Sequence, residues 1–133
     1  MDIEIFTICD AATISCGKLN ILGSFDRLYS KRFPFQHPDC AVAIKVRFEN
    51  AESGDHVMEV RFIDLDGQKI VPSQELKIRV TPPEGKRHLH MHISQFEGLP
   101  FQKPGEYYLD LVVDQQVRSR IPLFVMPAPT PPK

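Results

Sequence analysis

Apolar and polar residues alternate along most of this chain with a period of two, which indicates β-strands whose two faces differ. In residues 74–80, for example, the apolar side chains point one way while Glu75, Lys77 and Arg79 point the other. The predicted inward sets are Val42, Ile44, Val46 and Phe48 in residues 40–49; Met58, Val60 and Phe62 in residues 56–64; and Leu76, Ile78 and Val80 in residues 74–80.

Turn residues separate these segments. The Asp-Gly step in residues 64–67 favours a tight hairpin. Pro82 is expected to end the strand at residues 74–80. The pair Gln115–Gln116 separates two final strands, and Pro122 predicts a sheet edge or a bulge within the last of them.

With stretches around residues 3–8 and 19–25, the pattern predicts seven to nine strands. Turn signals every 8–12 residues favour an all-β, antiparallel two-sheet β-sandwich. The Gly-x-Tyr step in "PGEYYL" (residues 104–109) resembles the tyrosine corner of immunoglobulin-like sandwiches, in which a phenol anchors the preceding loop. The expected fold is therefore immunoglobulin-like.

The length of 133 residues fits one domain, which we place at residues 1–125. Residues 126–133 read "MPAPTPPK" and offer few donors and little apolar mass, so we expect a flexible, proline-rich tail there.

Composition narrows the functional classes. A formal net charge of −1 gives no overall field that would favour nucleic acid or an acidic lipid surface. We therefore expect no nucleic-acid partner and no membrane association. Three cysteines without a Cys-x-x-Cys pair, and an acidic start that does not resemble a signal peptide, predict a cytoplasmic protein with reduced thiols.

"GKLNILGSFDRL" (residues 17–28) begins a resemblance that continues through "FPFQHP" (33–38), Gly54-Asp55-His56, "DLDG" (64–67), "GLPFQKPGEY" (98–107) and "IPLFV" (121–125). In these motifs, over residues 8–125, the chain resembles an uncharacterised bacterial family of small stand-alone domains of unknown function. The resemblance implies a bacterial β-sandwich; it supplies no activity, ligand or catalytic residue.

"RHLHMHIS" (residues 87–94) places His88, His90 and His92 at alternate positions. Neighbours in such a row lie about 7 Å apart on one strand face, so one metal ion reaches two of them and needs ligands from elsewhere, such as His56 or a carboxylate. Leu89, Met91 and Ile93 form an apolar set on the opposite face, which places the histidines on the outer, solvated side. Three interpretations stay open: a solvated face, a face covered by a partner, and a metal site.

The remaining motifs favour structural interpretations. "DLDG" resembles the start of a calcium loop, with Glu75 at the twelfth position, but Pro72 and the other intervening residues do not fit one. The cysteines Cys9, Cys16 and Cys40 are expected to pack as small apolar residues. The sequence has neither a Gly-x-Ser-x-Gly elbow nor a phosphate-binding glycine loop.

These observations predict a non-enzymatic β-sandwich module without a cofactor, which binds another protein or itself through a sheet edge or face. The alternative is a metal-binding or metal-dependent protein that uses the strand carrying His88, His90 and His92.

Overall fold

The computed structural model describes residues 1–129, which form eleven β-strands and one 3₁₀ turn. In chain order these are β1 (Asp2–Ser15), β2 (Lys18–Ser24), β3 (Arg27–Ser30), β4 (Phe35–His37), β5 (Cys40–Phe48), η1 (Asn50–Glu52), β6 (Gly54–Ile63), β7 (Gln74–Val80), β8 (His88–Phe96), β9 (Leu99–Phe101), β10 (Gly105–Val113) and β11 (Gln116–Pro127).

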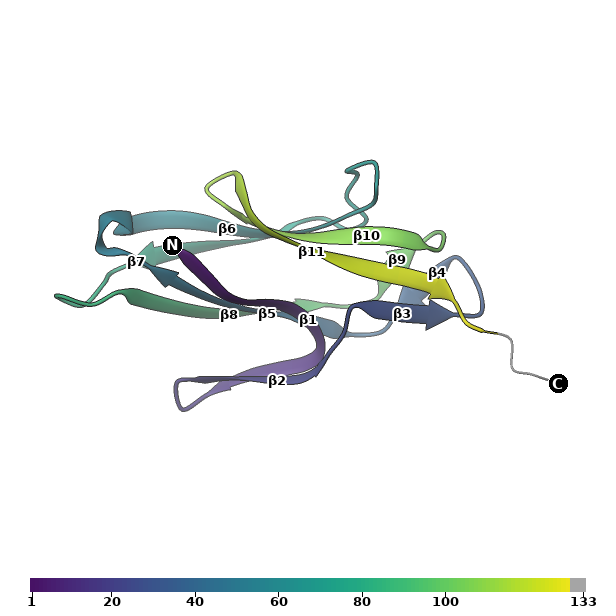
Figure 1. The fold of residues 1–133 in the computed structure, drawn as a ribbon, viewed down its shortest axis with the longest axis horizontal. Helices are drawn as coiled ribbons and strands as arrows, with labels where there is room; N and C mark the ends of the chain where they lie inside the picture. Colours follow the sequence, from purple (N-terminus) through teal and green to yellow (C-terminus); the bar gives the residue numbers. More distant parts are fainter. Residues whose placement is uncertain (130–133) are drawn as a thin grey trace.

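The strands form two larger sheets and one small one. Sheet A has the order β2-β1-β5-β8, sheet B has the order β3-β11-β10-β6-β7, and β4 and β9 form a two-stranded sheet C. Sheets A and B lie one above the other in Figure 1, with β7 and β8 on the same side of the molecule. This all-β arrangement is consistent with the expected β-sandwich. The prediction that the strands are all antiparallel is wrong, because β3 pairs in parallel with β11.

The core lies between sheets A and B and consists of the predicted apolar sets. Val42, Ile44, Val46 and Phe48 of β5 are buried, as are Met58, Val60 and Phe62 of β6 and Ile78 and Val80 of β7. The period-two pattern therefore identified the inner faces of these three strands.

The strand count exceeds the expected seven to nine within the described residues. β3 has four residues, and β4 and β9 have three each, so they are too short to show an alternating pattern. These short strands form because each pairs with a strand that is distant in sequence.

The last hairpin turns at Asp114 and Gln115, one residue earlier than predicted. Both residues have positive φ, 49° and 67°, as a two-residue turn matched to the twist of its strands requires. Pro122 lies opposite Tyr108 of β10, and β3 pairs with β11 only from Phe124 onward. The proline therefore stands where one side of β11 has no partner strand, as its missing N–H predicts.

The expected boundary at residue 125 is too early. β11 continues to Pro127, which pairs with Ser30, and the N–H of Ala128 donates to the carbonyl of Ser30 at 2.8 Å. Residues 130–133 of the expected tail lie outside the described residues.

Tyr107 Oη donates to the carbonyl of Lys103 at 2.6 Å, so this phenol anchors the preceding loop. Within residues 1–129, no helix has the length and hydrophobicity needed to cross a membrane.

The β1–β2 hairpin turns under the outer face of sheet A (Figure 1). The first half of β1 pairs with β5, and its second half pairs with β2. Gly23 has a φ of +69° opposite Asp10, where an added Cβ would lie 2.5 Å from Asp10 Oδ2. The bend therefore needs glycine there. It brings Leu19 and Ile21 of β2 onto buried Ala41 and Ala43 of β5.

Candidate functional site

The histidine row lies on β8, the edge strand of sheet A, and its side chains point inward. His88, His90 and His92 pair with Phe48, Val46 and Ile44 of β5, in that order, and those three are core residues. Directly paired residues of an antiparallel sheet share a face. The histidines therefore face the interior, not the solvated side that the sequence predicted.

Leu89, Met91 and Ile93 correspondingly lie on the outer face of sheet A, so their predicted place in the main core is also wrong. Leu89 is exposed, whereas Ile93 packs against Ala41 and Ala43 beside the β1–β2 hairpin. Because this hairpin covers part of the outer face, both faces of the strand carry partly buried side chains. Alternation alone could not show which set was inside.

The three imidazole rings stack along the strand. The centroids of His88 and His90 are 6.4 Å apart with 14° between the rings, and those of His90 and His92 are 6.4 Å apart with 22° between them. At the end of the row, Nδ1 of His88 accepts a hydrogen bond from the N–H of Thr81 at 3.2 Å.

Burial disfavours protonation in the middle of this row. Burial lowers the pKa of His90, and His92 and His88 lower it further; burial also lowers the pKa of His92. Nε2 of His90 is buried and has no hydrogen-bond partner among the described residues. Burial therefore favours the neutral form of His90 and His92, and one ring nitrogen of His90 is left unsatisfied.

A cavity of about 350 Å³ opens beside the row, between the edge strands of the two sheets. Ile44, Met58 and Val60 contribute its apolar surface, and Gln74 from β7 and His92 and Ser94 from β8 contribute polar groups. At its margin the Gln74 side-chain amide donates to the backbone carbonyl of Gln95 on β8.

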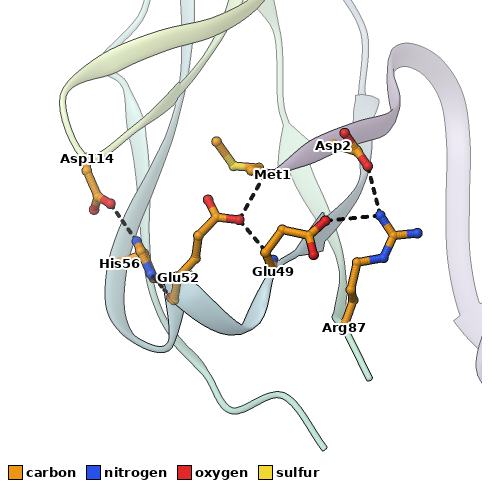
Figure 2. Close-up of polar contacts among 7 residues, drawn as sticks. All are labelled: Met1, Asp2, Glu49, Glu52, His56, Arg87 and Asp114. Atoms are coloured by element: carbon orange, nitrogen blue, oxygen red, sulfur yellow. Dashed lines mark hydrogen bonds and ion pairs between the residues drawn. The ribbon is translucent and has the colours of Figure 1, made fainter. Parts of the chain in front are cut away.

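His56, which the sequence offers as a further ligand to a metal on this row, makes its hydrogen bonds elsewhere. Its Nδ1–H donates to Asp114 Oδ2 at 2.5 Å, and its Nε2–H donates to the carbonyl of Glu52 at 2.5 Å (Figure 2). Both acceptors require the doubly protonated ring. The Asp114 carboxylate accordingly raises the pKa of His56, helped by the Glu52 carbonyl.

Met1 and Asp2 form ion pairs in the same region as His56. The terminal ammonium of Met1 lies 2.9 Å from Glu52 Oε1, and Arg87 lies 3.0 Å from Asp2 and 3.2 Å from Glu49 (Figure 2). Arg87, the residue before the histidine row, is thus held on the outer side of β8 by carboxylates of its own chain.

The other candidate ligands do not join the row. Cys9 and Cys40 are buried, Cys16 is exposed, and all three are free thiols. Burial raises the pKa of Cys40 to about 12, which suppresses its thiolate. Across residues 1–129, no group of three or more His, Cys, Asp and Glu side chains is placed to hold a metal ion.

The turn that the sequence predicts at "DLDG" is present. Asp64 Oδ1 accepts hydrogen bonds from the N–H groups of Asp66 and Gln68, both at 2.9 Å, and Gly67 takes a φ of +79°. The aspartate side chain thus bonds its own backbone, as turn-forming aspartates do.

A comparison with curated proteins finds no significant match. A family model does match, over residues 4–126, and it is described as a family of unknown function. This range covers nearly the whole chain and contains all the motifs on which the sequence resemblance rested. The protein is therefore a member of this family of unknown function, DUF6941.

Proposed function

We propose that this protein is a non-enzymatic interaction module whose binding surface is the free edge of β8. A partner segment would add to sheet A as a further strand, with backbone hydrogen bonds supplying affinity. The observation that carries the proposal is the lack of protection on this edge.

Natural proteins usually protect exposed sheet edges with charged residues, proline, bulges or short strands. Of the four edge strands in the two larger sheets, β7 carries Glu75, Lys77 and Arg79, and β3 has only four residues. β2 begins with Lys18 and contains a glycine at positive φ. β8 has nine residues, "HLHMHISQF", with no proline and no acidic or basic residue other than histidine.

Its pairing with β5 is continuous from Phe48 and His88 to Cys40 and Phe96, with no register shift. β8 is therefore a long, regular edge, which is the kind that accepts another strand.

The hydrogen bond to Gln95 indicates which backbone groups of β8 face the free edge. Its carbonyl accepts from Gln74 of β7, so this carbonyl points away from β5. Residues of an antiparallel strand alternate between those bonded to the neighbour and those that are not. Leu89, Met91 and Ile93 therefore also direct their N–H and C=O groups toward the free edge.

The cavity beside β8 supplies a place for a side chain of the added strand. Side chains of that strand opposite His92 and Ser94 would point inward, over the cavity lined by Ile44, Met58 and Val60. The lining combines these apolar side chains with the polar groups of Gln74, His92 and Ser94. Edge and cavity together resemble other strand-addition sites, in which the backbone gives affinity and pockets give specificity.

The test compares proteins captured from the host lysate by the intact chain and by two matched variants. Met91→Lys places a charge on β8, and Leu22→Lys places the same charge on β2, where Leu22 is 71% exposed. We expect Met91→Lys to lose the captured partner and Leu22→Lys to retain it. A partner held equally by both variants would refute the β8 edge as the binding surface.

Two finer assignments are also proposals. An immunoglobulin-like arrangement is supported by the Tyr107–Lys103 contact. A bacterial, cytoplasmic setting is supported by the family resemblance and by three free thiols, one of them exposed.

A further inference from the structure

The residues that flank β8 carry opposite charges. Arg87 precedes the strand and Glu97 follows it; both are exposed, and the nine residues between them include no other acidic or basic residue except histidine. If two copies of the strand run antiparallel, the basic end of each lies at the acidic end of the other. The following inference rests on the proposed use of this edge.

The possible registers are few. In an antiparallel pair, residues with free N–H and C=O groups must face each other, so odd-numbered residues of β8 pair with odd-numbered residues of a second copy. A two-fold axis at His92 sets Arg87 opposite the second copy's Glu97. A shift of one residue in the axis position sets Arg87 opposite Gln95 or Leu99 instead.

We infer that β8 pairs antiparallel with β8 of a second copy about a two-fold axis at His92, so that the two sheets A join into one continuous sheet. Such an interface is isologous, so the ion pair between Arg87 of one copy and Glu97 of the other occurs twice.

Two further pairs in this register are also compatible. On the outer face, Met91 meets the second copy's Ile93, an apolar pair. On the inner face, His90 meets the second copy's Ser94. His92 lies on the axis and meets His92 of the second copy.

The existing contacts of Arg87 do not prevent this pairing. Its guanidinium bonds Asp2 and Glu49 through one terminal nitrogen, Nη1. An arginine has five N–H donors, so others remain available for Glu97 of the second copy. Glu97 forms no ion pair within residues 1–129, which makes it the safer position for substitution.

Charge reversal tests the register. Sedimentation velocity should show a dimer for the intact protein, and Glu97→Arg and Arg87→Glu should each raise the dimer dissociation constant on the order of 10-fold or more, because two like-charge pairs replace two ion pairs. An equimolar mixture of the two variants should recover the dimer, since every pair in the mixed dimer is complementary. Circular dichroism of each variant checks that it folds.

Failure of this inference is distinguishable from failure of the proposed function. Met91→Pro removes an edge N–H while leaving the bonds to β5, so it should abolish the dimer. A dimer that Met91→Pro abolishes but that the charge variants leave unchanged overturns the register and keeps strand addition at β8. An intact protein that stays monomeric at 200 μM overturns self-pairing, whereas the lysate comparison still decides the proposed function. A dimer insensitive to Met91→Pro overturns the inference and removes β8 as the self-association edge.

Discussion

The surroundings of His56 and His90 shift their pKa values in opposite directions. Both residues lie against β5, His56 beside Phe48 and His90 beside Val46. His56 donates from both ring nitrogens, to Asp114 and to the Glu52 carbonyl, and its pKa is raised. His90 is buried beside two other imidazoles, and its pKa is lowered. Their contributions to stability therefore change with pH in opposite directions.

Burial of His90 and His92 predicts a loss of stability in acid. Their folded-state pKa values lie below the unfolded value of about 6.5, so the unfolded chain binds more protons as the pH falls below about 6.5. The free energy of unfolding should decrease through that range, down to the lowered folded pKa. The double variant His90→Gln, His92→Gln should decrease less, as measured by urea unfolding at pH 7.5 and pH 5. Parallel pH profiles for the two proteins would contradict this prediction.

The His56–Asp114 pair predicts the reverse trend. Because the folded pKa of His56 is raised, its stabilisation is fully present below about pH 6.5 and disappears as the pH rises through the folded pKa. Asp114→Asn keeps an acceptor for the N–H of Val57 and removes the charge. We expect a loss of about 1 kcal/mol at pH 5.5, at the low end for a charged hydrogen bond because Asp114 is half exposed, and less at pH 9. An equal loss at both pH values would show that the charge of His56 is not involved.

Metal binding by the histidine row has a separate test. Zinc at a hundred times its dissociation constant would add about 2.7 kcal/mol to the stability, which corresponds to a rise in melting temperature on the order of 10 °C. We expect chelated and zinc-supplemented samples to melt within about 2 °C of each other, because one ion reaches only neighbouring rings of the row. A large rise that disappears in His90→Ala would make the metal-binding alternative the leading one.

At the scale of elements, the first half of β5 is buried on both faces. Its inner face packs in the main core, while Ala41 and Ala43 on the outer face are fully buried under Leu19 and Ile21 of the β1–β2 hairpin. Small side chains on β5 let the hairpin approach closely, which explains why alanines alternate with large apolar residues in this strand.

Overpacking at this contact should be costly. Ala43→Leu adds three carbon atoms under the hairpin and should lower the free energy of unfolding by about 1–3 kcal/mol. Chemical denaturation of the variant and the intact protein measures the difference. The exposed site Leu22→Ala serves as a control and should change stability by less than about 0.5 kcal/mol. A neutral Ala43→Leu would mean that the hairpin does not pack tightly on β5.

At the scale of the whole molecule, the two sheets end side by side at β7 and β8, and the polar links between these strands include the Gln74 bond to Gln95 and the Thr81 bond to His88. β7 has charged residues along its outer face, whereas β8 does not. Any extension of sheet A on this side must therefore begin at the backbone of β8.

Hydrogen exchange can observe that backbone directly. The amides of Leu89, Met91 and Ile93 point to the free edge, so they should exchange rapidly in dilute protein, while the amide of His90 is protected by β5. Raising the protein concentration should protect the Met91 amide and leave His90 unchanged. Equal protection of both amides in dilute protein would show that the edge is already covered.

Much of this fold was predictable from local pattern. The inner faces of β5, β6 and β7 follow from strict alternation of large apolar and charged residues, because a charged side chain cannot be buried without a partner. The contact of Tyr107 with Lys103 and the turn at "DLDG" depend on residues a few positions apart, so they too were recognisable in the sequence.

The orientation of β8 was decided only by tertiary structure. Its two faces carry histidines and apolar residues, and a neutral imidazole can be buried or solvated, so neither face excluded the other. Pairing with β5 set His90 beside Val46 in the interior, and the β1–β2 hairpin covered Ile93 outside. Both events join residues far apart in the chain. The sequence by itself thus determined where the longer strands lie and which strand faces carry charge. Long-range pairing decided which face of the uncharged edge strand turned inward.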